Sequence, residues 1–345
     1  MTFATPQYSR NQVDKAGRIL IGREAGDMQQ TLTVVSNWRA SHSFPLNTFQ
    51  MGVRTKAHRI DSGALIAQRV KRLSSIEDKL RNQPSMQLSQ MQDIGGCRAV
   101  LQNVADVREL RDDYARSQFK HRFVKENDYI SEPKPSGYRG IHRVYRYYSD
   151  RNNTYNGLQL EVQMRSQLQH AWATAVETVS TFLRQSLKAS QGSEEWLRFF
   201  SLMGSAIAIR EGEPLVPGTP SAKKALVREI RDHVHNLDVR RTLSAFHTTL
   251  QMLSKQEVKA ARYYLVELEM SEGRSTVTVT EYTKPELDEA TADYLEAEQR
   301  LARSGPGSQA VLVSVESVSA LRRAYPNYFL DTGVFLRVLA ETLSD

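Results

Sequence analysis

Residues 158–165 alternate strictly between apolar and polar side chains. The apolar positions are Leu158, Leu160, Val162 and Met164, and the polar positions are Gln159, Glu161, Gln163 and Arg165. A period of two is typical of a β-strand that buries one face and leaves the other face polar. The pattern therefore predicts a strand whose polar row, with Glu161 near its middle, faces a cleft.

Helical periodicity follows directly after this strand and predicts a helix from Ser166 to about Gln185. Its expected buried side chains are Leu168, Trp172, Ala175, Val176, Val179 and Phe182. Residues 1–60 favour helices, with a turn at Ser43–Asn47. The spacing of Ser74 and Glu77 matches a capping box, so a helix is expected to begin there. The patterns also predict a turn feeding a strand at Met91–Leu101, a helix at 104–118 and a strand at 141–148.

Clusters of Gly, Ser and Pro between residues 186 and 220 predict a domain boundary. Beyond it we expect helices at 222–235, 239–255 and Pro285–Arg303, a hairpin of Tyr263–Met270 and Ser275–Tyr282, a strand at Gln309–Val315, and short helices around Tyr325–Tyr328. The fold class is α+β, with a mixed β-sheet domain flanked by helices and a small C-terminal α+β domain. The expected divisions are 1–60, 61–190, 191–258 and 259–345.

Composition changes this picture little. The chain has 345 residues, of which 40% are hydrophobic, and this is enough to build ordinary cores. No apolar run approaches the roughly 20 residues of a membrane span, and the N-terminus lacks the pattern of a signal peptide. We therefore expect a cytoplasmic protein with no membrane partner. The single cysteine, Cys97, excludes an internal disulfide and a cysteine-based zinc cluster.

Charge is distributed unevenly along the chain. Residues 263–345 hold 14 Asp and Glu against 7 Lys and Arg, so this segment carries −7 and the remainder carries +14 of the net +7. A basic body favours a polyanionic substrate, and an acidic tail favours an internal partner that competes with it. Solvated faces of unrelated sign would give the same totals.

Four polar motifs occur in order and carry the candidate chemistry. They are Arg69-x-Lys71-x-x-x-Ser75-x-x-x-Lys79, then Asp93-Ile-Gly-Gly-Cys-Arg98, then Lys134-x-Ser-Gly-Tyr138-Arg139-x-x-His142, and finally Glu161-x-Gln163-x-Arg165. In the third motif, a glycine beside an aromatic ring and flanking cations suits a loop that binds phosphate and stacks on a base. In content, order and spacing the four motifs resemble the RelA/SpoT synthetase domain, over roughly a third of the chain.

The resemblance implies transfer of pyrophosphate from ATP to a hydroxyl group, with residues 61–190 as the pyrophosphokinase core. By this resemblance Asp93 and Glu161 share Mg²⁺, and Glu161 orients or deprotonates the acceptor hydroxyl. The residues expected to bind ATP are Arg69, Lys71, Ser75, Lys79 and Arg98, and those expected to bind the acceptor are Lys134, Tyr138, Arg139, His142 and Gln163. Taken alone, Asp93 could be a turn residue, and Glu161 could pair with Arg165 on an exposed sheet face.

The acceptor stays open between a purine nucleotide and the 3′ end of tRNA. Relative to housekeeping members, one extra residue separates Trp172 from Glu177, and Thr178 stands where His or Asn is frequent, which weakens the expectation of guanine recognition. Basic residues at Arg54, Lys56 and Arg59 offer a tRNA surface. No histidine is followed by Asp, so the chain shows no sign of the His-Asp hydrolase of bifunctional members.

The tail resembles that of fused toxin–antitoxin members of the CapRel kind, with Tyr325-Pro-Asn-Tyr328 matching their Tyr-x-x-Tyr motif. This likeness implies that residues 259–345 are a regulatory, antitoxin-like domain that blocks the ATP site until a phage capsid protein or other phage protein displaces it. Aromatic pairs also occur in ordinary cores. A small alarmone synthetase that makes (p)ppGpp or (p)ppApp, and a catalytically idle RNA-binding or sensor module, remain the alternatives.

Overall fold

The computed structural model describes residues 3–186, 193–248, 250–254, 261–271, 274–304, 307–315, 317–329 and 331–344. The helices are α1 (Arg10–Leu20), α2 (Met28–Ala40), α3 (Ser43–Ile60), α4 (Leu73–Asn82), α5 (Val104–Arg116), α6 (Gln167–Ser186), α7 (Ser193–Glu211), α8 (Lys223–Asn236), α9 (Val239–Thr248), α10 (Leu287–Leu301), α11 (Val318–Ala324) and α12 (Gly333–Ser344), with short 3-10 helices η1 (Leu88–Gln90), η3 (Lys284–Glu286) and η4 (Pro326–Phe329). The strands are β1 (Leu65–Val70), β2 (Gly95–Leu101), β3 (Arg122–Asp128), β4 (Ile141–Arg146), β5 (Gln159–Ser166), β6 (Leu250–Ser254), β7 (Tyr263–Ser271), β8 (Arg274–Tyr282) and β9 (Gln309–Ser314).

Within the described ranges the strands form one mixed sheet in the order β3-β4-β5-β2-β1-β9-β7-β8-β6. Strands β2 and β5 run parallel, whereas β1 is antiparallel to β2 and β4 is antiparallel to β5. Strand β9 joins the edge of β1, with Gln68 opposite Ser314 and Arg69 opposite Val313. The C-terminal strands therefore extend the sheet of the predicted core instead of forming a separate sheet.

The strand register brings the motifs together. Arg69 lies opposite Gly96, which in turn lies opposite Glu161. Two residues further along β5, Gln163 lies between Arg98 and His142. Because directly paired residues share a face of a sheet, these side chains line one face.

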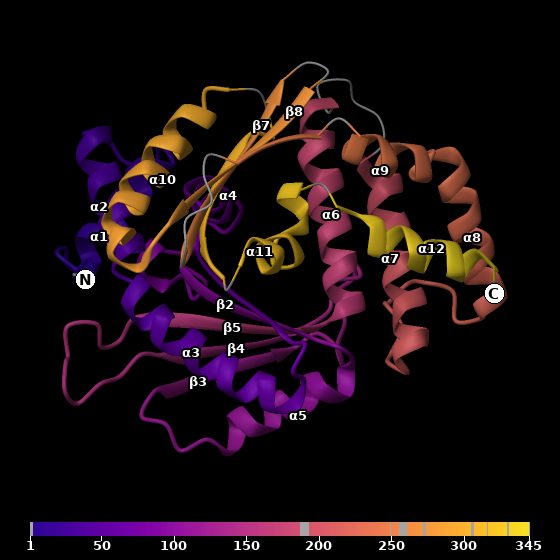
Figure 1. The fold of residues 1–345 in the computed structure, drawn as a ribbon, viewed down its shortest axis with the longest axis horizontal. Coiled ribbons are helices and arrows are strands. Elements are labelled where there is room, and N and C mark those ends of the chain that lie inside the picture. Colours follow the sequence, from indigo (N-terminus) through magenta and orange to yellow (C-terminus); the bar gives the residue numbers. More distant parts are fainter. Residues whose placement is uncertain are drawn as a thin grey trace.

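The opposite face is covered by α3 and α5, which lie across β3, β4 and β5 in Figure 1. The predicted alternation in β5 is confirmed here, since Leu158, Leu160, Val162 and Met164 are all buried in this core. The polar row of β5 consequently faces the other way, toward the motif residues. Within the described part of the chain, no helix combines the length and the apolar character that crossing a bilayer requires.

The C-terminal segment packs against the motif-bearing face. Helix α11 lies between the sheet and α6, and α12 crosses to the helices α7, α8 and α9 (Figure 1). Leu65 of β1 and Val100 of β2 share one core with Leu321, Tyr325 and Tyr328. Phe335 and Leu339 of α12 share a second core with α6 and α7. The segment from α11 to η4, residues 318–329, is thus held at both of its ends, and we call it the plug.

Several expectations about local structure were wrong. Residues 193–211, for which no helix was predicted, form α7, whose Phe199 and Met203 are fully buried. The expected turn at Ser43–Asn47 is the first turn of α3, where Pro45 is tolerated because no intrahelical donor is needed there. Helix α9 stops at Thr248 and is followed by β6, which pairs with β8. Strand β3 was also missed, because its charged residues hide the β pattern.

Candidate active site

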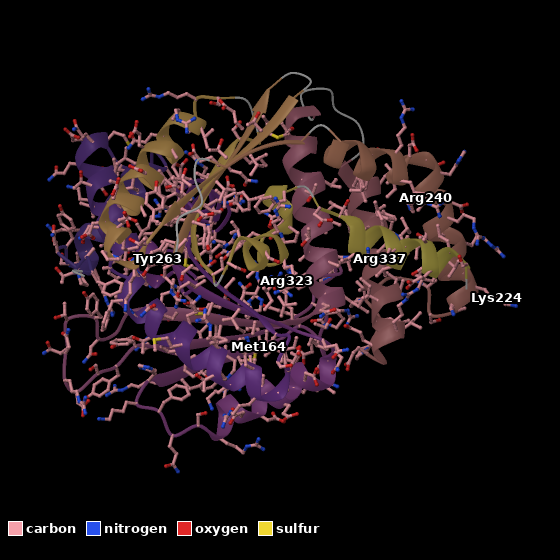
Figure 2. The ribbon with its side chains drawn as sticks, viewed as in Figure 1. Met164, Lys224, Arg240, Tyr263, Arg323 and Arg337 are labelled. Atoms are coloured by element: carbon pink, nitrogen blue, oxygen red, sulfur yellow. The ribbon has the colours of Figure 1, made fainter. Side chains whose placement is uncertain are left out.

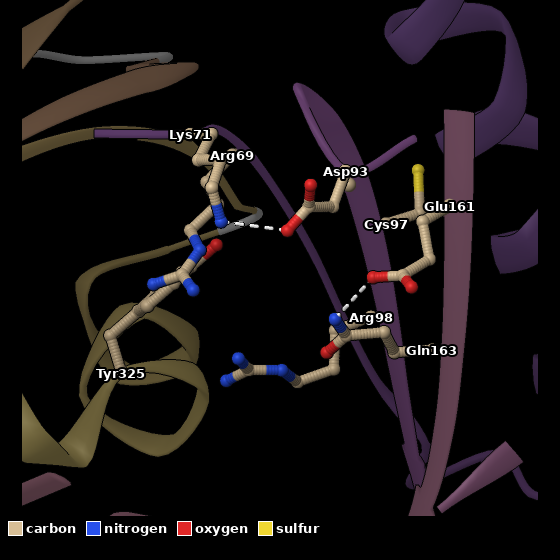
Figure 3. A pocket seen from close by; sticks show the side chains of 9 residues that line it. Arg69, Lys71, Asp93, Cys97, Arg98, Glu161, Gln163 and Tyr325 are labelled. Carbon is tan, nitrogen blue, oxygen red and sulfur yellow. Dashed lines mark hydrogen bonds and ion pairs between the residues drawn. The ribbon is translucent and has the colours of Figure 1, made fainter. Parts of the chain in front are cut away.

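The first, second and fourth motifs converge on one small cavity of about 40 Å³, and His142 of the third motif reaches it through its hydrogen bond to Glu161. Its walls are formed by Arg69, Lys71, Asp93, Gly96, Cys97, Arg98, Glu161, Gln163 and Tyr325. Figure 3 shows that the charged side chains of the cavity come from β1, β2, β5 and the loops that flank β1 and β2, and that Tyr325 comes from the C-terminal plug. The side chain of Cys97 turns to the other face of the sheet, where its thiol is hydrogen-bonded to the carbonyl oxygen of Leu46. A Cβ atom at Gly96 would meet only the carbonyl oxygen of Arg69, at 4.0 Å, so the glycine leaves the floor of the cavity open.

Asp93 lies between two ammonium groups. Its Oδ2 accepts a hydrogen bond from Nζ of Lys71 at 2.7 Å, and its Oδ1 accepts one from Nζ of Lys79 at 2.9 Å. Burial would raise the pKa of Asp93, but the two lysines outweigh burial and lower the pKa to about 2. The first two motifs therefore meet as an ionised carboxylate between two cations.

Glu161 is held by groups from two strands. His142 on β4 donates from Nδ1 to Oε1 of Glu161 at 2.9 Å, and Gln163 donates from Nε2 to Oε2 at 2.6 Å. Burial would raise the pKa of Glu161, but the hydrogen bonds from His142 and Gln163 lower it below its usual value. Glu161 does not pair with Arg165, whose guanidinium turns to Tyr138 and Gln163.

A chain of hydrogen bonds extends from Glu161 to the third motif. Arg165 donates from Nη2 to the hydroxyl oxygen of Tyr138 at 2.7 Å, so that hydroxyl group donates its own proton to Nε2 of His142. His142 then carries its proton on Nδ1, which faces Glu161. This order leaves Glu161 as the acceptor at the end of the chain.

Arg69 and Arg98 supply positive charge above the sheet. Burial, together with the nearby guanidinium groups, lowers the pKa of Arg98 to about 10, so Arg98 stays charged at neutral pH. Glu177 of α6 is half-buried, and although desolvation would raise its pKa, Arg69 and Arg98 lower it. The Nε atom of Arg98 is buried and has no hydrogen-bond partner among the described residues. An unfilled buried donor of this kind suits an anionic or polar ligand.

The plug enters the cavity through Tyr325. The guanidinium carbon of Arg98 lies 5.8 Å from the centre of the Tyr325 ring, and Nη1 of Arg98 donates to the carbonyl oxygen of Ala324 at 3.4 Å. Tyr325 packs edge-to-face on Tyr328, with the ring centres 6.3 Å apart. The hydroxyl group of Tyr328 accepts a hydrogen bond from Arg72 at 3.3 Å. Both tyrosines are buried, and burial raises the pKa of Tyr325 to about 12, so its ring is neutral.

A second contact joins the C-terminal part to the first motif. Glu298 of α10 accepts hydrogen bonds from Nη1 of Arg39 at 2.8 Å and from the backbone amide of Leu73 at 3.0 Å. Tyr294 accepts from Arg39 and donates to Glu298, each at 2.8 Å. Only 3% of the Arg39 side chain and 10% of the Glu298 side chain are exposed. A carboxylate from the tail thus caps the first amide of α4.

This cap corrects the expected start of α4. The helix begins at Leu73, its N-terminal cap residue is Arg72, and no side chain of the preceding residue caps it. The capping box predicted from Ser74 and Glu77 is absent, because Glu298 binds the first free amide instead. Ser75 lies on the first turns of this helix and is half-buried.

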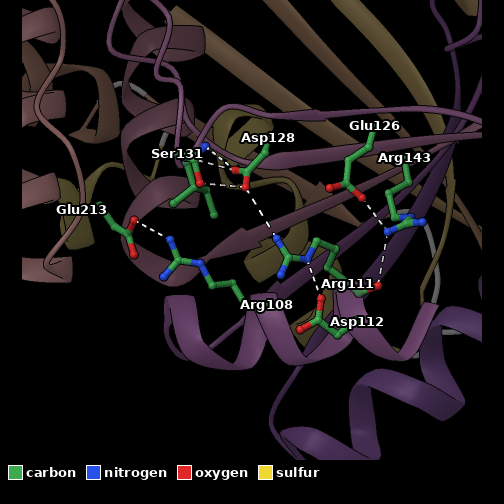
Figure 4. Close-up of polar contacts among 9 residues, drawn as sticks. Arg108, Arg111, Asp112, Glu126, Asp128, Ser131, Arg143 and Glu213 are labelled. Atoms are coloured by element: carbon green, nitrogen blue, oxygen red, sulfur yellow. Dashed lines mark hydrogen bonds and ion pairs between the residues drawn. The ribbon is translucent and has the colours of Figure 1, made fainter. Parts of the chain in front are cut away.

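The loop of the third motif is rigidly braced. Gly137 has φ +92°, and a Cβ atom there would lie 2.8 Å from the carbonyl oxygen of Phe200, so both its backbone and its surroundings require glycine. At the base of the loop, the Asp128 carboxylate accepts from the amides of Ile130 and Ser131 (Figure 4). Arg139 differs from the expectation: it is 2% exposed and donates to the carbonyl oxygens of residues 130 and 214, so it braces the loop.

Lys134 does remain exposed, with its Nζ 4.3 Å from the ring centre of Tyr129 and 5.3 Å from that of Tyr138. Of the basic residues expected to bind tRNA, Lys56 and Arg59 both pair with Asp113 on α5 at 3.0 Å. Arg54 is half-buried. These three residues therefore lie on α3, beside α5, and not at the cavity.

Comparison with known proteins matches the motif-bearing part of the chain. The model of the region found in RelA/SpoT proteins matches residues 68–182. We therefore call residues 68–182 the RelA/SpoT domain. The GTP pyrophosphokinase YjbM of Bacillus subtilis (strain 168) is 36% identical over 109 residues, which are 31% of this chain and 51% of YjbM. The GTP pyrophosphokinase YwaC of the same strain is 30% identical over 111 residues, which are 31% of this chain and 52% of YwaC.

The chain thus spans about half the length of these curated relatives. Among solved structures, that of the small alarmone synthetase 2 from Bacillus subtilis aligns with a TM-score of 0.42 and 20% identity, over 54% of this chain and 95% of that chain. The RelA/SpoT domain holds the cavity, whereas Tyr325 and Glu298 come from outside the matched residues.

The RelA/SpoT domain offers donors that fit Mg²⁺. The described residues contain no cluster of three or more His, Cys, Asp and Glu side chains that would hold a metal alone. Asp93 and Glu161, however, line the same cavity and are close enough for their charges to interact. Mg²⁺ commonly binds one or two carboxylates and completes its shell with substrate phosphates and water. The two carboxylates therefore fit an ion that arrives with a nucleotide.

Sequence reasoning missed three residues of this site and the hydrogen-bond partner of a fourth. Arg39, Tyr294 and Glu298 carry no motif and meet only because α10 folds back onto α2 and α4. Arg165 was assigned to the polar row of β5, but its bond to Tyr138 depends on the loop before β4. The polar alternation of β5 was the only available signal, and it identified the face but not the partner.

Proposed function

We propose that the protein is an ATP-dependent pyrophosphokinase whose C-terminal part holds it inactive. The observation that carries this proposal is the convergence of Arg69, Lys71, Asp93 and Glu161 on one cavity that also contains Tyr325. Phosphoryl-type transfer requires cations that bind phosphate and carboxylates whose charge is compensated, because positioning and charge compensation dominate that chemistry. The matched RelA/SpoT domain and its GTP pyrophosphokinase relatives support the same reaction.

In the proposed reaction, the oxygen of an acceptor hydroxyl attacks the β-phosphorus of ATP. The bond between that phosphorus and the oxygen bridging to the α-phosphate breaks, and AMP leaves. Glu161 takes the hydroxyl proton, and its hydrogen bonds from His142 and Gln163 keep the carboxylate oriented. When ATP binds, the ammonium groups of Lys71 and Lys79 leave Asp93 and bind the triphosphate instead. When bound by Asp93 and Glu161, Mg²⁺ neutralises charge on the phosphates.

The inactive state is supported by the size of the cavity. Ligand pockets usually span about 300–1,000 Å³, and the cavity here measures about 40 Å³ with Tyr325 in its wall. The ring of Tyr325 occupies the position beside Arg98 where a nucleobase would stack. The Glu298 carboxylate meanwhile binds the N-terminus of α4, which favours anions such as phosphate. Tail residues thus take the places of both ends of a nucleotide.

For the acceptor, we propose the 3′ end of tRNA, with a free purine nucleotide as the alternative. The supporting observation is the sheet edge formed by β3, which leads directly into the braced loop of the third motif. On β3 Arg122, Phe123 and Lys125 are exposed, and the Arg122 guanidinium lies 5.4 Å from the ring centre of Tyr148. Exposed rings among cations bind single-stranded nucleic acid by stacking and charge.

Displacement of the tail is proposed to follow binding of a phage protein, by the resemblance to fused toxin–antitoxin members. The −7 of residues 263–345 against the +14 of the remainder supports a closed state held partly by charge. A partner shifts that state only by the difference between its affinities for the open and closed forms. Toxicity in this proposal results from tRNA whose modified 3′ end cannot be aminoacylated.

The test supplies ATP labelled at its γ-phosphate, Mg²⁺ and one acceptor at a time: tRNA, GTP, GDP or ATP. The full chain and the variant Tyr325→Ala/Tyr328→Ala are compared, with Tyr328→Phe as the matched variant that keeps the ring. We expect label on tRNA from the double alanine variant and much less from the full chain. Label only on nucleotides would show that a purine nucleotide, and not tRNA, is the acceptor. Absence of label from every acceptor with both proteins would overturn the enzyme proposal.

The tRNA surface is tested separately. Arg122→Glu/Lys125→Glu should weaken tRNA binding and reduce the slope of log K against log salt by about 0.7–0.9 for each phosphate that the variant no longer binds. Lys224→Glu/Arg240→Glu is the matched control, because these exposed residues lie at the far helical end of the molecule (Figure 2). Equal effects of the two double variants would refute a tRNA surface on β3.

A further inference from the structure

A second cavity lies behind the plug. It measures about 280 Å³, sevenfold more than the cavity that contains Tyr325. One wall belongs to the RelA/SpoT domain and its approach, with Leu65, Val100 and Ala171 as its apolar part. The other wall belongs to the C-terminal part, with Pro326, Val334 and Phe335. The cavity therefore exists only while the plug is seated.

The charged side chains that line this cavity are two arginines and one aspartate. Arg322 and Arg323 belong to its lining, and the carboxylate at the cavity, Asp331, accepts a hydrogen bond from the amide of Gly333 at 3.0 Å. His170 is 8% exposed and bonds through Nε2 to the carbonyl oxygen of Arg323 at 3.0 Å. Burial, with Arg98 and Arg165 nearby, lowers the pKa of His170 to about 3, so His170 adds no charge.

From this geometry we propose that the second cavity is a binding site for a compact, apolar monocarboxylic acid, which holds the plug in its seated position. The apolar walls match an aromatic or branched hydrocarbon body. Arg322 and Arg323, the two cationic residues of the lining, are exposed and match a carboxylate, for which arginine provides paired donors. Nothing in the proposed chemistry of the first cavity uses these residues, so the site is distinct from the nucleotide site.

The consequence for activity rests on the proposed autoinhibition. A molecule that contacts both walls makes all of its contacts only in the closed form. When the plug leaves, it retains the contacts with one wall and loses those with the other. It therefore stabilises the closed form by its difference in affinity between the two forms. The acid acts as a co-inhibitor that raises the threshold for any partner that opens the enzyme.

Direct binding is measured first, by isothermal titration calorimetry of the full chain with 2-naphthylacetate. The uncharged 2-naphthylethanol is the matched ligand. We expect 2-naphthylacetate to bind at one site and the alcohol to bind about tenfold more weakly. Val334→Trp, at a position that is 43% exposed, should block the cavity without disturbing the fold, and Arg322→Gln/Arg323→Gln should remove the preference for the acid. No binding to the full chain, or binding that Val334→Trp leaves unchanged, overturns the site.

Coupling to the plug is measured with the open variant Tyr325→Ala/Tyr328→Ala. The same acid should bind this variant several-fold more weakly than the full chain, and saturating acid should lower the residual transfer activity of the full chain. Equal affinity for both proteins overturns the co-inhibitor role. Binding is read by calorimetry without any turnover, so failure of the enzyme proposal would leave the binding result interpretable on its own.

Discussion

In the proposed autoinhibited enzyme, replacing Glu298 by Gln should raise activity without touching the cavity. Glu298 joins Arg39 and the amide of Leu73 at 2.8 and 3.0 Å, and both of those groups belong to the N-terminal half of the chain. The substitution keeps an acceptor oxygen for the Leu73 amide but removes the charge that compensates Arg39. The contact bridges the tail and the RelA/SpoT domain, so its removal weakens the closed form selectively.

The size of the effect follows from the burial of the pair. Hydrogen bonds to charged groups contribute about 1.5–3 kcal/mol when buried, and only 3% of Arg39 and 10% of Glu298 are exposed. A loss of about 2 kcal/mol raises the open fraction roughly 30-fold, because each 1.4 kcal/mol is a factor of ten. Label transfer by the full chain should increase by up to this factor while the open form remains a minority.

The assay compares label transfer and ATP affinity of Glu298→Gln with those of Glu296→Gln. Glu296 is an exposed residue of the same helix, so its replacement changes net charge equally without reaching Arg39. Thermal unfolding of both variants checks that the fold persists. If the two variants show the same transfer rate and the same ATP affinity, Glu298 does not restrain the enzyme and the reasoning is refuted.

Three further predictions concern the cavity itself. In the open variant, Glu161→Gln should reduce transfer by several orders of magnitude with an unchanged far-ultraviolet spectrum, and near-normal turnover would remove Glu161 from the mechanism. Tyr138→Phe breaks the hydrogen bond to His142 and should lower kcat about tenfold while leaving the KM for ATP unchanged; a change confined to that KM would contradict the relay. The pKa of Asp93 is depressed from 3.8 to about 2, so its stabilisation of about 2 kcal/mol is present above pH 4 and is lost as the pH falls from about 4 to 2; urea unfolding should show this loss, and Asp93→Asn should abolish it.

Much of the RelA/SpoT domain was predictable because local periodicity and motif order agree there. The alternation of residues 158–165 predicts both the strand and its buried face, and β5 confirms both. The hairpin of residues 263–282 was equally clear, since two β-rich runs flank a short turn. These signals are local, so one sequence is sufficient to reveal them.

Features that depend on distant partners were not predictable. Residues 193–211 carry glycine and serine that suggest a boundary, yet Phe199 and Met203 form a helix because α6, α8 and α12 surround them. Helix α4 begins at Leu73 because Glu298, more than two hundred residues away, caps it. Neither tertiary contact leaves a trace in local propensity, which is weak compared with burial.

In the proposed autoinhibited form, the joint between β1 and β9 constrains how the tail would be released. Strands β7 and β9 pair continuously from Tyr263 and Ser314 to Leu268 and Gln309, whereas β1 and β9 pair, among the described residues, only around Gln68 and Arg69. This joint is therefore the weak point of the hydrogen-bonded ladder. Separation of β1 from β9 would expose Leu65 and Val100, which share a core with the plug.

Exposure of that core is unfavourable in water, at about 25 cal/mol for each Å² of apolar surface. A trigger that binds only surface already exposed in the closed form has equal affinity for both forms and cannot open the enzyme. An effective trigger must instead contact residues that are now buried, such as Tyr325 or Tyr328, or cover the apolar edge left by the plug. The segment through which release operates is thus the same segment that fills the cavity, and mutations that abolish triggering are expected to coincide with those that unlock the enzyme.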